Sequence, residues 1–136
     1  MDIESLKKLK TGLEEEIKSY DSMLRISLKE KDVLSGENFP KELISLASKK
    51  HKLINRINAI NSKIDPLKAL WVQEREMLSA SPMEKEIAPL ISRLGNILDE
   101  LMTVDRNNMK KLSDMTEADW NKNAVKNSGK KAEGAG

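Results

Sequence analysis

The sequence predicts an all-α protein: an antiparallel bundle of three long helices (a coiled-coil-like hairpin plus a third helix) with a disordered C-terminal tail. Apolar residues recur at spacings of three and four in three successive segments, which is typical of amphipathic helices. Short segments containing glycine or proline separate these three segments. Only 3% of the 136 residues are aromatic and 34% are charged, a composition that disfavours a β-sandwich and suits helices that each bury one narrow stripe.

The first helix is predicted over about residues 2–34, with Asp2 as its N-cap. Its apolar stripe consists of Ile3, Leu6, Leu13, Ile17, Tyr20, Leu24 and Leu34. Three polar residues interrupt this stripe, namely Lys10, Ser27 and Lys31. The helix is expected to end at Gly36 with a left-handed residue, and Pro40 suits the first turn of the next helix. So short a break predicts a helical hairpin.

The second helix is predicted over about residues 40–78 and has the most regular pattern. Its apolar positions are Leu43, Leu46, Leu53, Ile57, Ile60, Ile64, Leu67, Trp71 and Leu78. Lys50 and Glu74 interrupt the pattern. Because its phase continues past Pro66, we expect one helix with a kink at this proline rather than two separate helices.

The third helix is predicted over about residues 83–115, after a start signal of Ser81 as N-cap, Pro82 and Glu84. Its stripe comprises Ile87, Leu90, Ile91, Leu94, Ile97, Leu98, Leu101, Val104, Met109, Leu112 and Met115. Pro89 either bends this helix or marks where its regular part begins. The helices form one predicted domain, residues 1–115. Residues 116–136 are predicted to be a flexible tail, because they have too few apolar residues to offset the entropy of ordering.

The sequence contains no recognisable catalytic or metal-binding constellation. There is no cysteine, and the single histidine, His51, lies among lysines with no nucleophile or second ligand nearby in the sequence. The acidic run 14–16 points in different directions around a helix, so its carboxylates do not converge. We therefore expect no enzymatic activity, no metal and no cofactor.

Charge also limits the classes of partner. The formal net charge is only +2. A small basic patch at Lys49, Lys50, Lys52 and Arg56 has no aromatic residues on which bases could stack, so no nucleic-acid partner is expected. The sequence has neither a signal-peptide pattern nor an apolar run long enough for membrane insertion. We expect a cytoplasmic protein.

The third stripe is the candidate partner-binding surface, because it is wider than one helix–helix seam and rich in methionine. Unbranched methionine side chains repack easily and suit surfaces that accept a partner helix, although they also fill cores. Trp120, in the tail, is an aromatic of the kind common at interfaces. The candidate residues are Leu94, Leu98, Leu101, Met102, Asp105, Asn108, Met109, Leu112, Met115 and Trp120. For Asn108 two interpretations stay open: a bundle-end residue that reaches water, or a seam residue that fixes register.

Three segments carry a resemblance to a known family, the FlgN-like flagellar hook–filament-junction export chaperones. Residues 28–37 look like the family's charged helix end followed by a glycine-containing turn. Residues 43–54 are similar to its apolar pairs around a central lysine, here Lys50. Residues 98–112 resemble its late helix, with Asn108 at the second of two common asparagine positions and Asp105 at the first. The resemblance spans about residues 4–115.

The resemblance implies a non-enzymatic chaperone of flagellar type III export. Such proteins bind the C-terminal helical segments of hook–filament-junction subunits, prevent their premature assembly and deliver them to an export-gate protein at the membrane. Two alternatives stay open. One is a related filament-cap export chaperone. The other is a structural coiled-coil adaptor or spacer that self-associates, as a homo-oligomer, through the same apolar seams.

Overall fold

The computed structural model describes residues 1–36, 39–78 and 82–115, and within these ranges all regular structure is helical. The helices are α1 (Ile3–Val33), α2 (Phe39–Leu78) and α3 (Pro82–Asp114). This confirms the predicted all-α three-helix bundle, and each helix begins and ends within one residue of its predicted bounds. The predicted tail, residues 116–136, lies outside the described residues. None of the described helices is long and apolar enough to cross a membrane.

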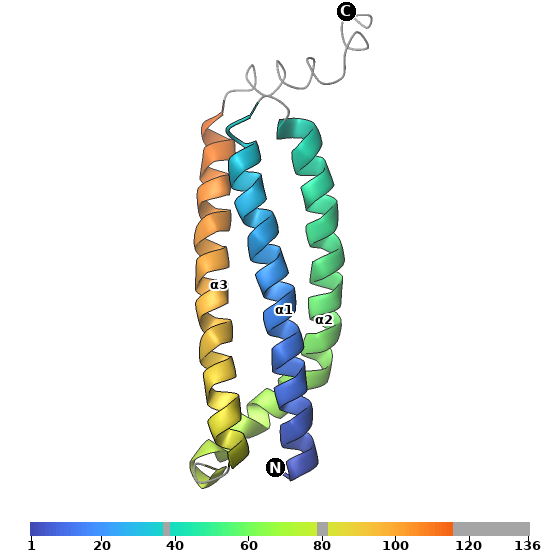
Figure 1. The fold of residues 1–136 in the computed structure, drawn as a ribbon, viewed down its shortest axis with the longest axis vertical. Coiled ribbons are helices and arrows are strands. Elements are labelled where there is room, and N and C mark those ends of the chain that lie inside the picture. The colour runs from blue at the N-terminus through green and yellow to red at the C-terminus, as the bar shows by residue number, and fades with distance from the viewer. Residues whose placement is uncertain (37–38, 79–81, 116–136) are drawn as a thin grey trace, which may run out of the picture.

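The helix α1 lies between α2 and α3 (Figure 1). It packs along both neighbours, whereas α2 and α3 approach each other's backbones far less. The centre of the bundle is therefore built around α1, whose side chains Leu9, Leu13 and Ser27 are completely buried. This arrangement leaves part of the facing sides of α2 and α3 without a helical neighbour.

The two ends of α1 show one confirmed prediction and one correction. The carboxylate of Asp2 accepts a hydrogen bond from the backbone N–H of Ser5 (2.7 Å), so Asp2 is the N-cap. At the other end Gly36 does not have a left-handed backbone, and that prediction was wrong. The helix instead ends in a tight turn, in which the N–H of Gly36 donates to the carbonyl of Val33 (2.8 Å).

The helix α2 continues through Pro66, as predicted. Proline has no N–H to donate to the carbonyl four residues earlier, which weakens the helix at that turn. Figure 1 shows α2 bending in its lower part, so that its last segment crosses the base of the bundle toward the start of α3. The bend brings Trp71 into the core cluster that contains Leu13 and Ile87. Pro89 also lies inside a continuous helix, α3, and the predicted cap Ser81 lies outside the described residues.

A close contact between α1 and α2 explains why position 12 is a glycine. A Cβ atom on Gly12 would lie 2.2 Å from Cγ2 of Ile64, far inside van der Waals contact. Only glycine allows the two helices to approach so closely at this level. Gly12 thus belongs to the packing of the apolar core.

Candidate protein-binding surface

The inner side of α3 is used for folding. Leu94, Leu101 and Asn108 follow one another at intervals of seven residues, and all three are buried against the rest of the bundle. They were among the predicted partner-binding residues. The structure places them inside the protomer, so a partner that leaves the bundle intact does not reach them.

The adjoining side of α3 remains exposed. The side chains of Met102 and Met109, each one residue after a buried position, are 58% and 71% exposed. Leu112 is also exposed, whereas Leu98, Asp105 and Met115 are half-buried. Trp120 lies outside the described residues. The apolar stripe of α3 is thus wider than its two neighbours cover, as the sequence predicted.

A polar cluster joins all three helices beside this exposed side. Lys50 of α2 forms ion pairs with Glu30 of α1 (2.5 Å) and Asp105 of α3 (2.9 Å). The hydroxyl of Ser27 donates to the same Asp105 oxygen (2.6 Å), and the side-chain amide of Asn108 donates to the carbonyl of Ser27 (2.9 Å). Asn108 therefore does not reach water, and its contact agrees with a role in fixing register. We call these five residues the Lys50 cluster.

The environment of Lys50 favours its charged form. Burial lowers the pKa of Lys50, but the hydrogen bonds that it donates to Glu30 and Asp105, together with their negative charges, raise it by more. The net result is a pKa above its ordinary value of 10.5. Lys50 is consequently a permanent cation at neutral pH, and a structural residue rather than a proton donor or acceptor.

The contact between Lys50 and Asp105 shows which sides of α2 and α3 are neighbours. Residues three or four positions apart share one side of a helix, so Met102 and Met109 lie on the same side of α3 as Asp105. By the same spacing Ile54, which is 42% exposed, lies on the Lys50 side of α2. We define the exposed apolar face as Ile54 of α2 with Met102, Met109 and Leu112 of α3, bordered by the half-buried Leu98.

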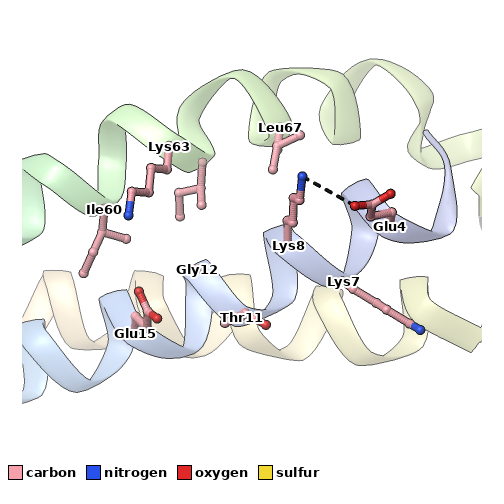
Figure 2. A pocket seen from close by; sticks show the side chains of 10 residues that line it. Glu4, Lys7, Lys8, Thr11, Gly12, Glu15, Ile60, Lys63 and Leu67 are labelled. Carbon is pink, nitrogen blue, oxygen red and sulfur yellow. Dashed lines mark ion pairs between the residues drawn. The ribbon is translucent and has the colours of Figure 1, made fainter.

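A second surface feature lies between α1 and α2. It is a groove of about 610 Å³ beside Gly12 (Figure 2). Its apolar floor is formed by Ile60, Ile64 and Leu67, and its rim carries both lysine and glutamate side chains. Lys8 and Glu4 of this rim pair with each other (3.7 Å). The rim thus carries side chains of both charges.

Among the described residues, no three His, Cys, Asp or Glu side chains lie close enough together to hold a metal ion. His51 lies on an exposed part of α2. Ile54, Ser27 and Glu30 were not among the predicted site residues. A signal for Ser27 was present, because it interrupts the stripe of α1 much as Lys50 interrupts that of α2. For Ile54 no signal was available, because its place beside α3 depends on how α2 is rotated in the bundle.

The chain was also compared with known proteins. No family model, no curated protein and no solved structure matches it.

Proposed function

We propose that this protein is a non-enzymatic chaperone that holds an amphipathic helix of a client on the exposed apolar face. The observation that carries the proposal is the exposure of Met102 and Met109 on a helix whose other side is fully packed. In a chain with 34% charged residues, two exposed methionines that lie two turns apart on a well-packed helix, with Asp105 between them, support a surface that a partner covers.

A helix is the occupant that fits this face best. Leu98, Met102, Met109 and Leu112 recur at spacings of three, four and seven residues, which matches the repeat of a packed helix and not that of a strand. Methionine side chains adapt to differently shaped partners. A chaperone with several related clients needs this adaptability.

The energetics of such a face suit reversible binding. Burying an apolar side chain of this size contributes about 1.5–3 kcal/mol, and the face offers only a handful of them. Ordering a client segment on binding offsets about 2–5 kcal/mol of the gross interaction. The complex would then hold the client firmly enough to cover its apolar side and weakly enough to release it.

The resemblance to FlgN-like chaperones supports a specific client, the C-terminal helical segments of hook–filament-junction subunits. It also supports delivery to an export-gate protein. Lys50, the central lysine of that resemblance, is in contact with Asp105, which stands where the family commonly has asparagine. They support the bundle beside the exposed apolar face, although they are not themselves offered to a client.

The test is binding of peptides from the C-termini of junction subunits, measured by isothermal titration calorimetry on the full chain. Replacing both Met102 and Met109 by serine is expected to weaken binding at least about tenfold, because about 1.4 kcal/mol of lost burial has that effect. Ile3→Ser is the matched control, since it removes a side chain that is 67% exposed at the far end of α1. Equal affinity of the double variant and the control would contradict the proposal.

Two further measurements separate the alternatives. Removing residues 116–136 tests Trp120, and unchanged affinity would exclude the tail from the binding site. Sedimentation of the free protein tests self-association. A stable oligomer that the Met102→Ser, Met109→Ser double variant dissociates would favour the coiled-coil adaptor. Binding of filament-cap rather than junction peptides would assign the other chaperone family.

A further inference from the structure

Another groove runs between α1 and α3, on the side of α1 away from the groove beside Gly12. We call it the α1–α3 groove, and its volume is about 460 Å³. Its floor is apolar and consists of Ile17 of α1 with Pro89 and Leu90 of α3. Ile17 is buried at the base, whereas Pro89 is exposed. The groove therefore offers an apolar surface that a partner can reach.

The rim of the α1–α3 groove has an excess of positive charge. It carries four basic side chains and two acidic ones, namely Lys10, Lys18, Lys85 and Arg93 with Glu14 and Glu86. This excess of two positive charges equals the formal net charge of the whole chain, which is +2. The groove beside Gly12 has three basic and two acidic side chains, so its rim is closer to neutral. A rim with the charge of the α1–α3 groove favours an acidic partner.

Most of this positive charge is free to meet a partner. Lys10 pairs with Glu86 (3.4 Å), which neutralises one charge of each sign. The other three basic side chains, Lys18, Lys85 and Arg93, form no hydrogen bond or ion pair with any described residue. Glu14 is the one rim carboxylate that is unpaired in the same sense. Three unpaired cations thus share this groove with a single unpaired anion.

The unpaired cations lie at both ends of the groove. Lys85 and Arg93 are eight residues apart on α3, which corresponds to about 12 Å along the helix axis. Because α1 and α3 run in the same direction (Figure 1), the pair of Lys10 with Glu86 shows which of their residues are neighbours. Lys18 follows Lys10 by eight residues, so it lies near residue 94, next to Arg93. One end of the groove therefore has Lys18 and Arg93, and the other has Lys85.

We infer that the α1–α3 groove binds a short acidic helix of a partner protein, with apolar side chains on the floor and carboxylates at both ends. Two carboxylates seven residues apart on one side of a helix are separated by about 10.5 Å, which matches the spacing of the cations. Apolar residues three and four positions after the first carboxylate lie between the two on the same side. This is the spacing that a floor formed by Pro89 and Leu90 can accept.

The inference does not rest on the proposed function, because the two surfaces are separate. Arg93 precedes Met102 by nine residues, which is two and a half helical turns. The α1–α3 groove and the exposed apolar face therefore lie on opposite sides of α3. One bound helix cannot occupy both.

The groove suits an acidic helix better than a nucleic acid. Glu14 and Glu86 would repel a strand that carries a negative charge on every phosphate. The described residues that line the groove include no aromatic side chain on which a base could stack. An apolar floor instead gains stability from burying leucine or isoleucine side chains of a partner.

The experiment measures binding of a synthetic, stapled helical peptide of about 14 residues to the full chain by fluorescence anisotropy. Its glutamates are seven residues apart, and its leucines follow the first glutamate by three and four positions. One control peptide has glutamine in place of the glutamates, and another has serine in place of the leucines. Each control is expected to bind at least about tenfold more weakly, because it lacks either the charges or the apolar contacts.

Variants of the protein locate the binding site. Lys18→Gln combined with Arg93→Gln is expected to weaken binding of the acidic peptide about tenfold, because two contacts with carboxylates are lost. Lys49→Gln combined with Lys52→Gln is the matched control, since it removes two exposed cations from α2 and is expected to leave affinity unchanged. Glu14→Gln is expected to strengthen binding about two- to threefold by removing a repulsion. The melting temperature of each variant shows that the fold is retained.

The outcomes distinguish this inference from the proposed function. Equal affinities of the Lys18→Gln, Arg93→Gln variant and its α2 control would overturn the inference. Loss of binding in the Met102→Ser, Met109→Ser variant would also overturn it, because the peptide would then lie on the exposed apolar face. An oligonucleotide that displaces the peptide at equal concentration would overturn the acidic helix as the occupant. Binding that only the groove variant weakens would support the inference, even if junction-subunit peptides do not bind.

Discussion

The two ends of the bundle combine apolar packing and polar contacts in different proportions. Near the N-terminus of α1, Gly12 lets α1 and α2 come into close contact, and Trp71 closes the core from below the bend in α2. Near the other end, Lys50 ties α1 to α3 through Glu30 and Asp105. Directed contacts occur at both ends, since Lys68 of α2 also pairs with the buried Glu16 of α1 (2.7 Å). The apolar end, around Gly12, has the larger apolar core, and the polar end has the Lys50 cluster that joins all three helices. The exposed apolar face lies beside the polar end.

This difference suggests why the exposed apolar face stays open in the folded bundle. Apolar side chains alone would allow α2 to slide or close over the methionines of α3. The Lys50 cluster holds α2 and α3 in one register, and a charged group displaced from it would be left without a partner. We interpret the Lys50 cluster as the set of contacts that fixes the register of α2 against α3. Variants at each end of the bundle test this interpretation.

The largest effect is expected from Lys50→Met. Glu30 and Asp105 would then be left partly buried without a counter-ion, which destabilises the fold by about 2–3 kcal/mol; fully buried pairs lose more. The measurement is urea unfolding followed by circular dichroism. Adding Glu30→Gln and Asp105→Asn to Lys50→Met removes the unpaired charges and is expected to recover part of the loss. A triple variant as unstable as the sum of its parts would show that the three groups do not act as a unit.

A smaller effect is expected from Gly12→Ala at the apolar end. The new methyl group collides with Ile64, which costs more than the helix propensity gained, for a net loss of about 1–2 kcal/mol. Gly95→Ala is the matched control with the opposite sign, because position 95 is open. Combining Gly12→Ala with Ile64→Ala is expected to cost less than the sum of the two. Equal stabilities of the two glycine variants would refute the close contact.

The smallest effect is the pH dependence that Lys50 contributes at the polar end. Because folding raises the pKa of Lys50, its contribution is fully present below the unfolded pKa of 10.5 and is lost as pH rises through the folded pKa. The stability difference between the natural protein and Lys50→Met should therefore shrink above about pH 10.5. Unfolding curves of both proteins from about pH 9 to about pH 12 measure this difference. A constant difference over that range would exclude the ionised lysine as its source.

The fold was predictable because each helix shows its own period. The apolar residues that repeat in α2 include Ile57, Ile64 and Trp71, and all three are buried. The continuity of phase across Pro66 correctly predicted one kinked helix. Gly36 shows the limit of such rules, since a glycine after a helix does not require a left-handed backbone.

The candidate surface was only half predictable. The excess width of the α3 stripe was visible in the sequence, and Met102 and Met109 are exposed. The same stripe could not show which of its members face α1, so Leu94 and Leu101 were included although both are buried. That division depends on the rotation of α3 about its axis. Contacts between helices set this rotation, and the spacing along one helix does not reveal it.

Because α2 bends at Pro66, the two ends of the bundle differ in shape. Without this bend, the last turns of α2 would run past the N-terminus of α1 instead of crossing the base of the bundle. The roughly three turns of α2 that follow Pro66 instead cross the base of the bundle (Figure 1), and their Trp71 packs into the core. A helix bound along α3, as we propose, would meet these turns of α2 at the Pro66 end of the bundle. Pro66 would thereby limit how far such a helix can extend toward that end.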